Sequence, residues 1–238
     1  MLKNSRNEIK FLITKADAID LYNKLRCVMT TDIHATDNNE YFIRSLYYDD
    51  QYASAYTTKI DGDNNRQKYR IRIYNMSDDT ISFERKLKRN NKVNKISFNM
   101  KRYQYEQLMA DNYHVLNEID HPLVSEIIGL HNSVGLKPTV VVDYYRTALL
   151  HPLSNTRITF DKHLRAGINS YDVFDEDLYT YPIFPQDSVI LEVKYDKVIP
   201  AHISAILGSI YGHKMALSKF CLCRSKLSQM NIKNSIIY

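Results

Sequence analysis

The chain has 238 residues, of which 44% are hydrophobic and 25% are charged, a composition typical of a folded globular protein and not of a disordered one. We expect a single domain over residues 1–238, because the length suits one large core and no low-complexity linker or internal repeat interrupts it. The formal net charge of +5 permits a polyanionic partner without demanding one.

Neither a membrane span nor a targeting segment is predicted. No apolar run approaches the ~20 residues that a spanning helix needs, and no signal-peptide pattern follows Met1. The three cysteines form no disulfide framework, which suits a reducing compartment. These features predict a cytoplasmic protein.

The chain begins with a predicted β-strand over residues 6–13, where polar and apolar residues alternate. The charged face of this strand carries Arg6, Glu8 and Lys10. Thr14, followed three positions later by Asp17, is typical of a helix N-terminus and predicts an amphipathic helix of roughly a dozen residues.

A β-hairpin is the clearest pattern in the middle of the chain. Strands are predicted over 69–74 and 81–88, joined by a polar turn at 75–80. Alternation places Arg70 and Arg72 on one face of the first strand, and the apolar residues on the other. On the second strand, one face carries Ser82, Glu84, Lys86 and Lys88.

The remaining elements are predicted by the same rules. Further strands are expected over 41–49, 93–98, 139–150, 156–161 and 189–195. Helices are expected after Asp50, after the capping residue Asn99, over 123–130, after Pro200 and from 218 onward. Residues 165–185 are predicted to be a loop with short structured pieces, and 231–238 a frayed tail.

Several strands therefore pair an apolar face with a face of arginine, lysine and one acid. A flat sheet would expose these charges to water, whereas a barrel would close around them with helices on its apolar outside. A dry charged interior would be prohibitively costly, so such a barrel would be a wet tunnel for an anion. Periodicity alone does not choose between the sheet and the barrel.

Seven short motifs, in order along the chain, resemble those of one family. They are Arg6-x-Glu8-x-Lys10, Tyr69-Arg70-x-Arg72-x-Tyr74, Phe83-Glu84-x-Lys86, Tyr144-x-Arg146, Arg157-Ile-Thr-Phe-Asp161, Leu191-Glu192-x-Lys194-Tyr195 and Ser218-Lys219-Phe220. Together they look like the VTC domain, the polyphosphate polymerase branch of the triphosphate tunnel metalloenzymes, which are related to the CYTH proteins. The resemblance spans nearly the whole chain.

The resemblance implies an α+β fold with an eight-stranded antiparallel β-barrel, the triphosphate tunnel, and helices packed outside. It implies that the catalytic residues contacting phosphate oxygens are Arg70, Arg72, Lys86, Arg146, Arg157 and Lys219. Further substrate-binding residues would be Arg6, Lys10, Lys95, Lys194 and Ser218. The metal, Mn²⁺ or Mg²⁺, would be held mainly by Glu192, with help from Glu8 and Glu84.

The activity implied is a polyphosphate polymerase, an enzyme that transfers the γ-phosphate of ATP to a growing inorganic polyphosphate chain. In the wider superfamily, the first strand carries the motif Glu-x-Glu-x-Lys. This chain differs, because Arg6 occupies the position of the first glutamate. Two other hypotheses stay open: a hydrolase of tripolyphosphate or nucleoside triphosphates on the same tunnel, and a non-catalytic polyphosphate-binding module. If polymer crosses a membrane, a separate membrane partner must supply the channel.

Other patterns predict no additional site. Asp61-Gly62-Asp63 lacks the later carboxylates of a calcium loop and is better explained as a turn. Cys221-x-Cys223 lacks zinc-site spacing and a fourth ligand. The 19 tyrosines are scattered among expected core positions, so we expect packing and no nucleic-acid partner.

Overall fold

The structure is a computed structural model that describes residues 7–32, 39–90, 92–208 and 213–230. The chain divides into two compact units, which are described separately. The first unit comprises Met1–Phe42, Tyr144–Arg165 and Pro182–Lys219, and the second Ile43–Asp143, Ala166–Tyr181 and Phe220–Tyr238. Strands β3 (Glu40–Asp49), β7 (Lys137–Leu150), β8 (Arg157–Gly167) and β9 (Thr180–Pro182) contribute residues to both units.

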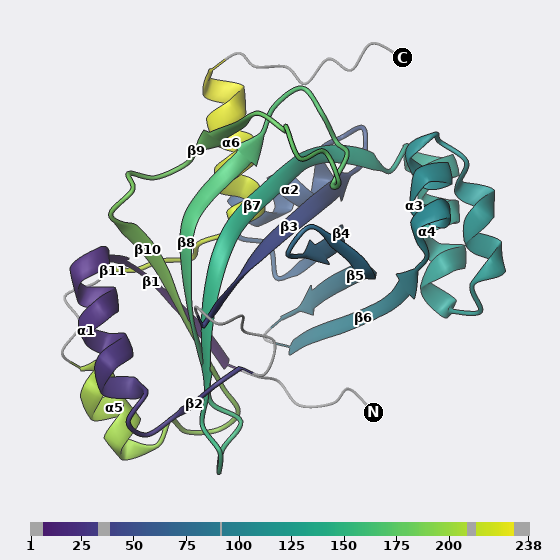
Figure 1. Cartoon of the computed structure of the whole chain (residues 1–238). Coiled ribbons are helices and arrows are strands. Elements are labelled where there is room, and N and C mark those ends of the chain that lie inside the picture. Colours follow the sequence, from purple (N-terminus) through teal and green to yellow (C-terminus); the bar gives the residue numbers. More distant parts are fainter. Residues whose placement is uncertain (1–6, 33–38, 91, 209–212, 231–238) are drawn as a thin grey trace. The chain divides into compact units, whose positions relative to one another are not determined.

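The first unit is built on antiparallel strands in the order β11-β1-β10-β8-β7, with β2 on β7 (Figure 1). Besides its parts of β7 and β8, it contains β1 (Asn7–Thr14), α1 (Lys15–Leu25), β2 (Thr30–Thr31), β10 (Ser188–Tyr195), α5 (Ala201–Leu207) and β11 (His213–Lys214). The strands expected over 6–13, 156–161 and 189–195 are therefore confirmed within the described residues.

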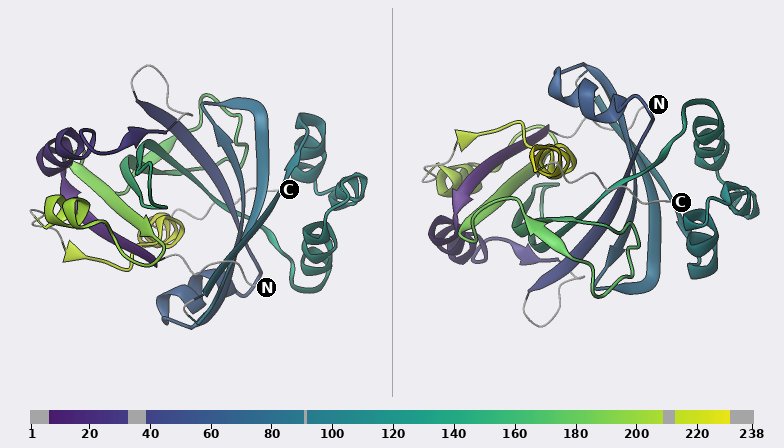
Figure 2. Two further views of the ribbon diagram at one scale, coloured as in Figure 1. Left: turned by 90° about the horizontal axis from the view of Figure 1, so that it is seen from below. Right: turned by 90° about the horizontal axis from the view of Figure 1, so that it is seen from above.

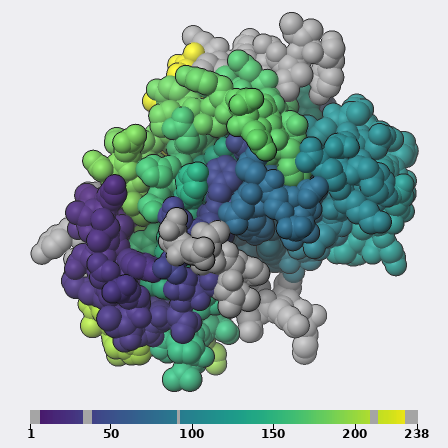
Figure 3. Space-filling view, viewed as in Figure 1, coloured from purple at the N-terminus to yellow at the C-terminus, as the bar shows by residue number. Residues whose placement is uncertain are grey.

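Two helices cover the apolar face of these strands. The predicted capping box is present at α1, where the Thr14 hydroxyl accepts from the Asp17 amide and the Asp17 carboxylate accepts from Thr14. The helix buries Leu21 and Leu25 in a core that includes Ile158 of β8. Figure 3 shows α1 in purple at the lower left, with α5 in lime green beneath it. The opposite face of the strands is left for polar side chains.

The second unit has the strand order β7-β3-β4-β5-β6. Its further elements are α2 (Ser54–Ile60), β4 (Asn65–Tyr74), β5 (Ser77–Arg89), β6 (Lys92–Met100), α3 (Arg102–Met109), the 3₁₀ helix η1 (Tyr113–Glu118), α4 (Pro122–Val134) and α6 (Lys219–Gln229), of which the first residue, Lys219, belongs to the first unit. Helices α3, η1 and α4 lie on one side of β4, β5 and β6 (Figure 2). They close a core that contains Ile71, Phe83 and Leu123.

The hairpin of β4 and β5 confirms the predicted faces and corrects the predicted turn. Ile71 and Ile73 are fully buried, while Arg70 and Arg72 belong to the opposite face. The turn was expected over 75–80, but β5 already begins at Ser77. The connection is short because Asn75 and Met76 both adopt left-handed backbone angles, with φ of 50° and 57°, as tight hairpin turns require.

Two other boundaries differ from the prediction. Asn99 does not cap a helix, because β6 continues to Met100 and α3 takes Lys101 as its N-terminal flanking residue. The side chain of Gln104 accepts from the Lys101 amide and completes this helix start. The polar stretch 165–185 contains the short strand β9, and the expected tail over 231–238 lies outside the described residues.

The structure is α+β with a large antiparallel sheet and helices. Within each unit, the described strands form an open series and do not close on themselves. The expected eight-stranded barrel is therefore not confirmed. None of the helices in the described part of the chain combines the length and the hydropathy of a membrane span.

Gly167 gives a test of packing in the second unit. A Cβ on this residue would lie 2.8 Å from Val141 Cβ, a rigid neighbour, and 3.1 Å from Leu178. We expect Gly167→Ala to lower the free energy of unfolding by about 1–3 kcal/mol, as overpacking does. Chemical denaturation checks this value.

Gly129 is the matched control, because nothing lies within 4 Å of a Cβ at this exposed position of α4. Gly129→Ala should stabilise the protein by roughly 0.5–1 kcal/mol, since alanine restricts the unfolded chain and favours helix. Equal effects of the two substitutions would contradict the packing described at Gly167.

Candidate functional site

Three neighbouring strands of the first unit bring polar residues into one row. In the antiparallel register, Lys10 of β1 lies opposite Glu192 of β10, and Glu192 lies opposite Thr159 of β8. Side chains directly opposite each other in a sheet project to the same face. The alternation seen in the sequence therefore gathers charges from residues far apart in the chain.

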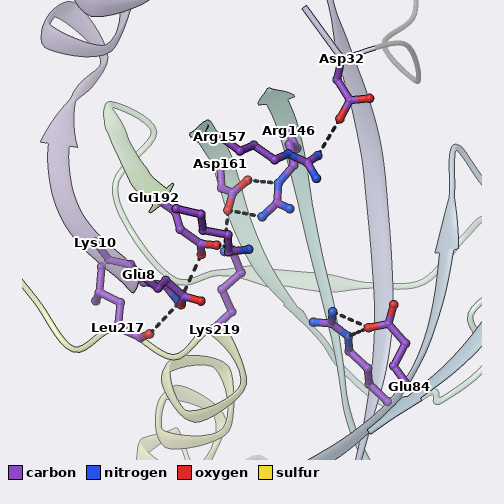
Figure 4. A network of polar contacts seen from close by, with 12 residues as sticks. Glu8, Lys10, Asp32, Glu84, Arg146, Arg157, Asp161, Glu192, Leu217 and Lys219 are labelled. Carbon is purple, nitrogen blue, oxygen red and sulfur yellow. Dashed lines mark hydrogen bonds and ion pairs between the residues drawn. The ribbon is translucent and has the colours of Figure 1, made fainter. Parts of the chain in front are cut away.

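Glu192 lies between two lysines. Its Oε2 is 3.3 Å from Lys10 Nζ, and its Oε1 is 2.5 Å from Lys194 Nζ. The Lys10 ammonium also lies 2.9 Å from Glu8 Oε1 and donates to the Leu217 carbonyl oxygen at 3.2 Å (Figure 4). Burial alone would raise the pKa of Glu192, but the charges of Lys10 and Lys194 bring it well below its ordinary value. Glu192 is therefore an ionised, buried carboxylate.

The pKa values of Lys10 and Lys194 are shifted in opposite directions. Burial would lower the pKa of Lys10, but the nearby Glu192 and Glu8 carboxylates raise it above its ordinary value. For Lys194, burial prevails over the opposing effect of Glu192 and Glu8 and lowers the pKa to about 8. Lys194 is thus the one of this pair that can lose its proton near neutral pH.

Asp161 of β8 is the second buried carboxylate, and it also holds two cations (Figure 4). Arg146 of β7 donates to it with both Nε, at 2.6 Å, and Nη2, at 2.8 Å. Lys219 Nζ lies 2.5 Å from its Oδ2. Against the effect of burial, Arg146 and Lys219 lower the pKa of Asp161 to about 2. Both cations also face the ring of Tyr144, at 5.3 and 4.7 Å from its centroid.

Arg157 lies at the edge of the same face. Its Nη2 donates to Asp32 Oδ2 at 2.6 Å and to the Tyr41 hydroxyl at 3.1 Å. Asp32 is itself buried, so this contact is a partly desolvated ion pair. We call the nine charged residues of the first unit the cation–carboxylate cluster. Its members are Lys10, Arg146, Arg157, Lys194, Lys219, Glu8, Asp32, Asp161 and Glu192.

The second unit repeats the same construction around Glu84. Arg70 Nε donates to Glu84 Oε2 at 2.7 Å, and Lys95 Nζ lies 2.7 Å from Oε1. Burial opposes ionisation, but Arg70, Arg72 and Lys95 lower the pKa of Glu84 below its ordinary value. Arg70 also donates to the Tyr47 hydroxyl, and the buried Arg72 donates to Ser45. Glu84 is thus ionised and buried between cations.

The expected metal ligands are only partly brought together. Glu8 and Glu192 share Lys10 as a partner, while Glu84 belongs to the second unit. Among the described residues, no group of three or more potential ligand side chains is found. Mg²⁺ in phosphate enzymes is commonly held by one or two carboxylates plus substrate phosphates and water. Glu8 and Glu192 fit this requirement.

The other predicted residues have different surroundings. Lys86 is exposed on β5, Ser218 is half-buried just before α6, and Arg6 lies outside the described residues. Sequence reasoning did not assign functional roles to Asp161, Asp32, Tyr144 and Tyr41. Asp161 shares the alternating face of Arg157, so pairing of β8 with β7 could have identified it. No sequence pattern indicates that Asp32 pairs with Arg157.

The arrangement suits binding of a multiply charged anion. Arginine forks and ammonium groups are good donors to phosphate or carboxylate oxygens. The cluster of the first unit has five cations and four carboxylates, and most of its charge is compensated internally. An anion that binds there has to exchange places with these carboxylates or arrive with cations of its own.

Comparison with solved structures identifies proteins of similar fold. The chain resembles a Bacillus halodurans protein provisionally described as an adenylate cyclase, with 11% identity, a TM-score of 0.50, and coverage of 100% of this chain and 96% of the other. This likeness concerns the fold alone. A Pyrococcus furiosus conserved hypothetical protein has 12% identity, a TM-score of 0.44, and coverage of 90% and 96%. The Schizosaccharomyces pombe Mediator head module has 10% identity, a TM-score of 0.43, and coverage of 94% and 95%.

The last two likenesses are too weak to support any inference about this chain. A comparison with curated proteins gives no match. The family model of the VTC domain matches residues 5–228, which include most of each unit and all of the predicted site residues. This chain belongs to the VTC domain family.

Proposed function

We propose that this protein is a polyphosphate polymerase that transfers the γ-phosphate of ATP to the end of an inorganic polyphosphate chain. The observation that supports it most is the cation–carboxylate cluster, where Asp161 holds Arg146 and Lys219 on a polar face of an α+β protein of the VTC family. The proposal includes the eight-stranded tunnel barrel that the sequence resemblance implies. It also includes a cytoplasmic location, where ATP is available.

The residues suit phosphoryl transfer because this reaction depends mainly on positioning and charge stabilisation. The bond between the β,γ-bridging oxygen and the γ-phosphorus breaks, ADP leaves, and the terminal oxygen of the acceptor chain bonds to that phosphorus. The acceptor oxygen is already anionic, so no general base is needed. Arg70, Arg72, Lys86, Arg146, Arg157 and Lys219 would contact phosphate oxygens, supported by Arg6, Lys10, Lys95, Lys194 and Ser218.

Carboxylates in the site hold these cations in place before substrate arrives. Lys10 and Lys194 share Glu192, and Lys219 shares Asp161 with Arg146. Phosphate oxygens would take over part of these contacts, so the cations need little rearrangement to bind. Glu192 and Glu8 would hold Mn²⁺ or Mg²⁺, and Glu84 would assist. When bound, the metal would neutralise charge on the transferring phosphoryl group.

Lys194 favours a second candidate function, hydrolysis of tripolyphosphate or nucleoside triphosphates. A hydrolase needs a group that accepts a proton from the attacking water, and a lysine with a pKa of about 8 can do so. The third possibility is binding of polyphosphate without turnover. One product assay distinguishes all three.

Purified protein incubated with ATP and Mn²⁺ should produce long-chain polyphosphate and ADP, and chelation of the metal should stop the reaction. Gel electrophoresis of the polymer and chromatography of the nucleotides measure both products. Release of orthophosphate without polymer would replace the polymerase with the hydrolase. Binding of polyphosphate without turnover, with either metal, would identify a binding module.

The pKa of Lys194 predicts a pH dependence of phosphate binding. The ammonium is charged below pH 8 and neutral above it, so affinity for tripolyphosphate should fall as the pH rises from 7 to 9. Any proton that tripolyphosphate itself loses in this range affects the wild type and a variant with a permanently charged side chain equally. We expect a loss of about 10-fold, the effect of one charge-assisted hydrogen bond. Calorimetric titration at each pH measures it.

Lys194→Arg is the matched variant, because a guanidinium stays protonated throughout this range. Its affinity should not show the fall between pH 7 and 9 that is expected of the wild type. If the affinity changes with pH in the same way in the variant and the wild type, a group other than Lys194 causes the pH dependence.

A further inference from the structure

Thr159 lies at the centre of the polar face but has no place in the interactions described above. It stands on β8 between Arg157 and Asp161, with both of these residues on its own face of the strand. In the neighbouring strand it lies opposite Glu192. The residue is 1% exposed. Its side chain is therefore buried on the face of the sheet that carries Arg157, Asp161 and Glu192 of the cation–carboxylate cluster.

The Thr159 hydroxyl has no hydrogen-bond partner among the described residues. A buried hydroxyl that loses its water partners without gaining new ones destabilises the fold. Valine has nearly the same shape and also favours β-strands, so it would fill this position without that cost. Folding alone does not explain a threonine here.

A second donor in the same place also lacks a partner. Arg157 Nε is buried and makes no hydrogen bond within the described ranges, although Nη2 of the same side chain binds Asp32 and Tyr41. Residues two apart on a strand are about 6.7 Å apart along its axis. Two unsatisfied donors from neighbouring positions on one strand face, which also carries Asp161 with its partners Arg146 and Lys219, match a ligand that offers several acceptor oxygens in series.

We propose that the Thr159 hydroxyl donates a hydrogen bond to a phosphoryl oxygen of the bound substrate, beside a second hydrogen bond from Arg157 Nε. Thr159 is then a substrate-contacting residue that aligns the phosphate chain along β8. A hydroxyl adds direction without adding charge, whereas the neighbouring ammonium groups act as mobile point charges. This inference rests on the proposed function, because it needs a phosphate ligand in the cluster.

Thr159→Val tests the inference, since it removes the hydroxyl and keeps the shape. Without ligand, the variant should melt at the same temperature as the wild type or higher. Its Kd for tripolyphosphate should rise by about 10-fold to 100-fold, the range for a hydrogen bond to a charged group. Thr159→Ser, which restores the hydroxyl, should recover most of the affinity. Differential scanning calorimetry and isothermal titration calorimetry supply the two measurements.

Thr156 provides the matched control, because it is also buried next to β8 but its hydroxyl accepts a hydrogen bond from Ser154 at 2.9 Å. Thr156→Val should lower the melting temperature and leave the Kd unchanged. The opposite signs of the stability changes distinguish an unsatisfied hydroxyl from a satisfied one.

Wild-type affinity in the Thr159→Val variant would overturn the inference and leave the proposed function intact. If the wild type itself does not bind tripolyphosphate, both the proposed function and this inference fail. Should the valine variant not fold, Thr159→Ala takes its place, with the same rise in Kd expected and the same outcome overturning it.

Discussion

The polar face of the first unit depends on the ion pairs that the buried Asp161 carboxylate makes with Arg146 and Lys219. Arg146 and Lys219 can be buried there only because Asp161 compensates them, since an unpaired buried charge costs several kcal/mol. Such pairs rarely stabilise a fold more than apolar residues of the same volume would. A protein that needed only stability could fill this face with aliphatic side chains. The cluster is therefore better explained by a ligand than by folding.

The same construction occurs three times, and each time one buried carboxylate lies between two cations. The three groups are Asp161 with Arg146 and Lys219, Glu192 with Lys10 and Lys194, and Glu84 with Arg70 and Lys95. The Asp161 and Glu84 groups each keep a net positive charge, whereas Glu8 also contacts Lys10 and neutralises the Glu192 group. All three carboxylates hold their cationic donors in place. Preorganised donors cost little to rearrange when charge develops on a phosphoryl group. The chain can therefore hold many cationic donors on polar faces although its net charge is only +5.

The sequence predicted the face of the strand on which a side chain lies more reliably than it predicted the ends of the elements or the ion-pair partners. Alternation correctly separated Arg70 and Arg72 from Ile71, because the side-chain period of a strand is fixed. The turn after Tyr74 was predicted too long, because nothing in the sequence shows that Met76 adopts a left-handed conformation. The eight-stranded barrel rested on family resemblance and the single domain on length and composition, and both stay predictions.

Ion-pair partners were beyond sequence reasoning for a different reason. Asp32 reaches Arg157 across 125 positions of the chain, and only the folded register of β2 beside β7 brings it near. Lys86, predicted to contact phosphate by motif alone, is exposed on β5. Alternation specifies which face a side chain joins, whereas its partner depends on long-range pairing of strands.

The most direct test of the central claim is the affinity of Lys219→Met for tripolyphosphate, measured by titration calorimetry. Asp161 keeps its two hydrogen bonds from Arg146, so the variant should fold, and methionine replaces most of the lysine's volume. Lys24→Met, at an exposed ion pair on α1, serves as the control. We predict that Kd rises by about 10-fold to 100-fold in Lys219→Met, as expected for a charge-assisted hydrogen bond, and stays unchanged in the control. Equal affinities in the wild type and both variants would show that the cluster serves the fold and not a phosphate ligand.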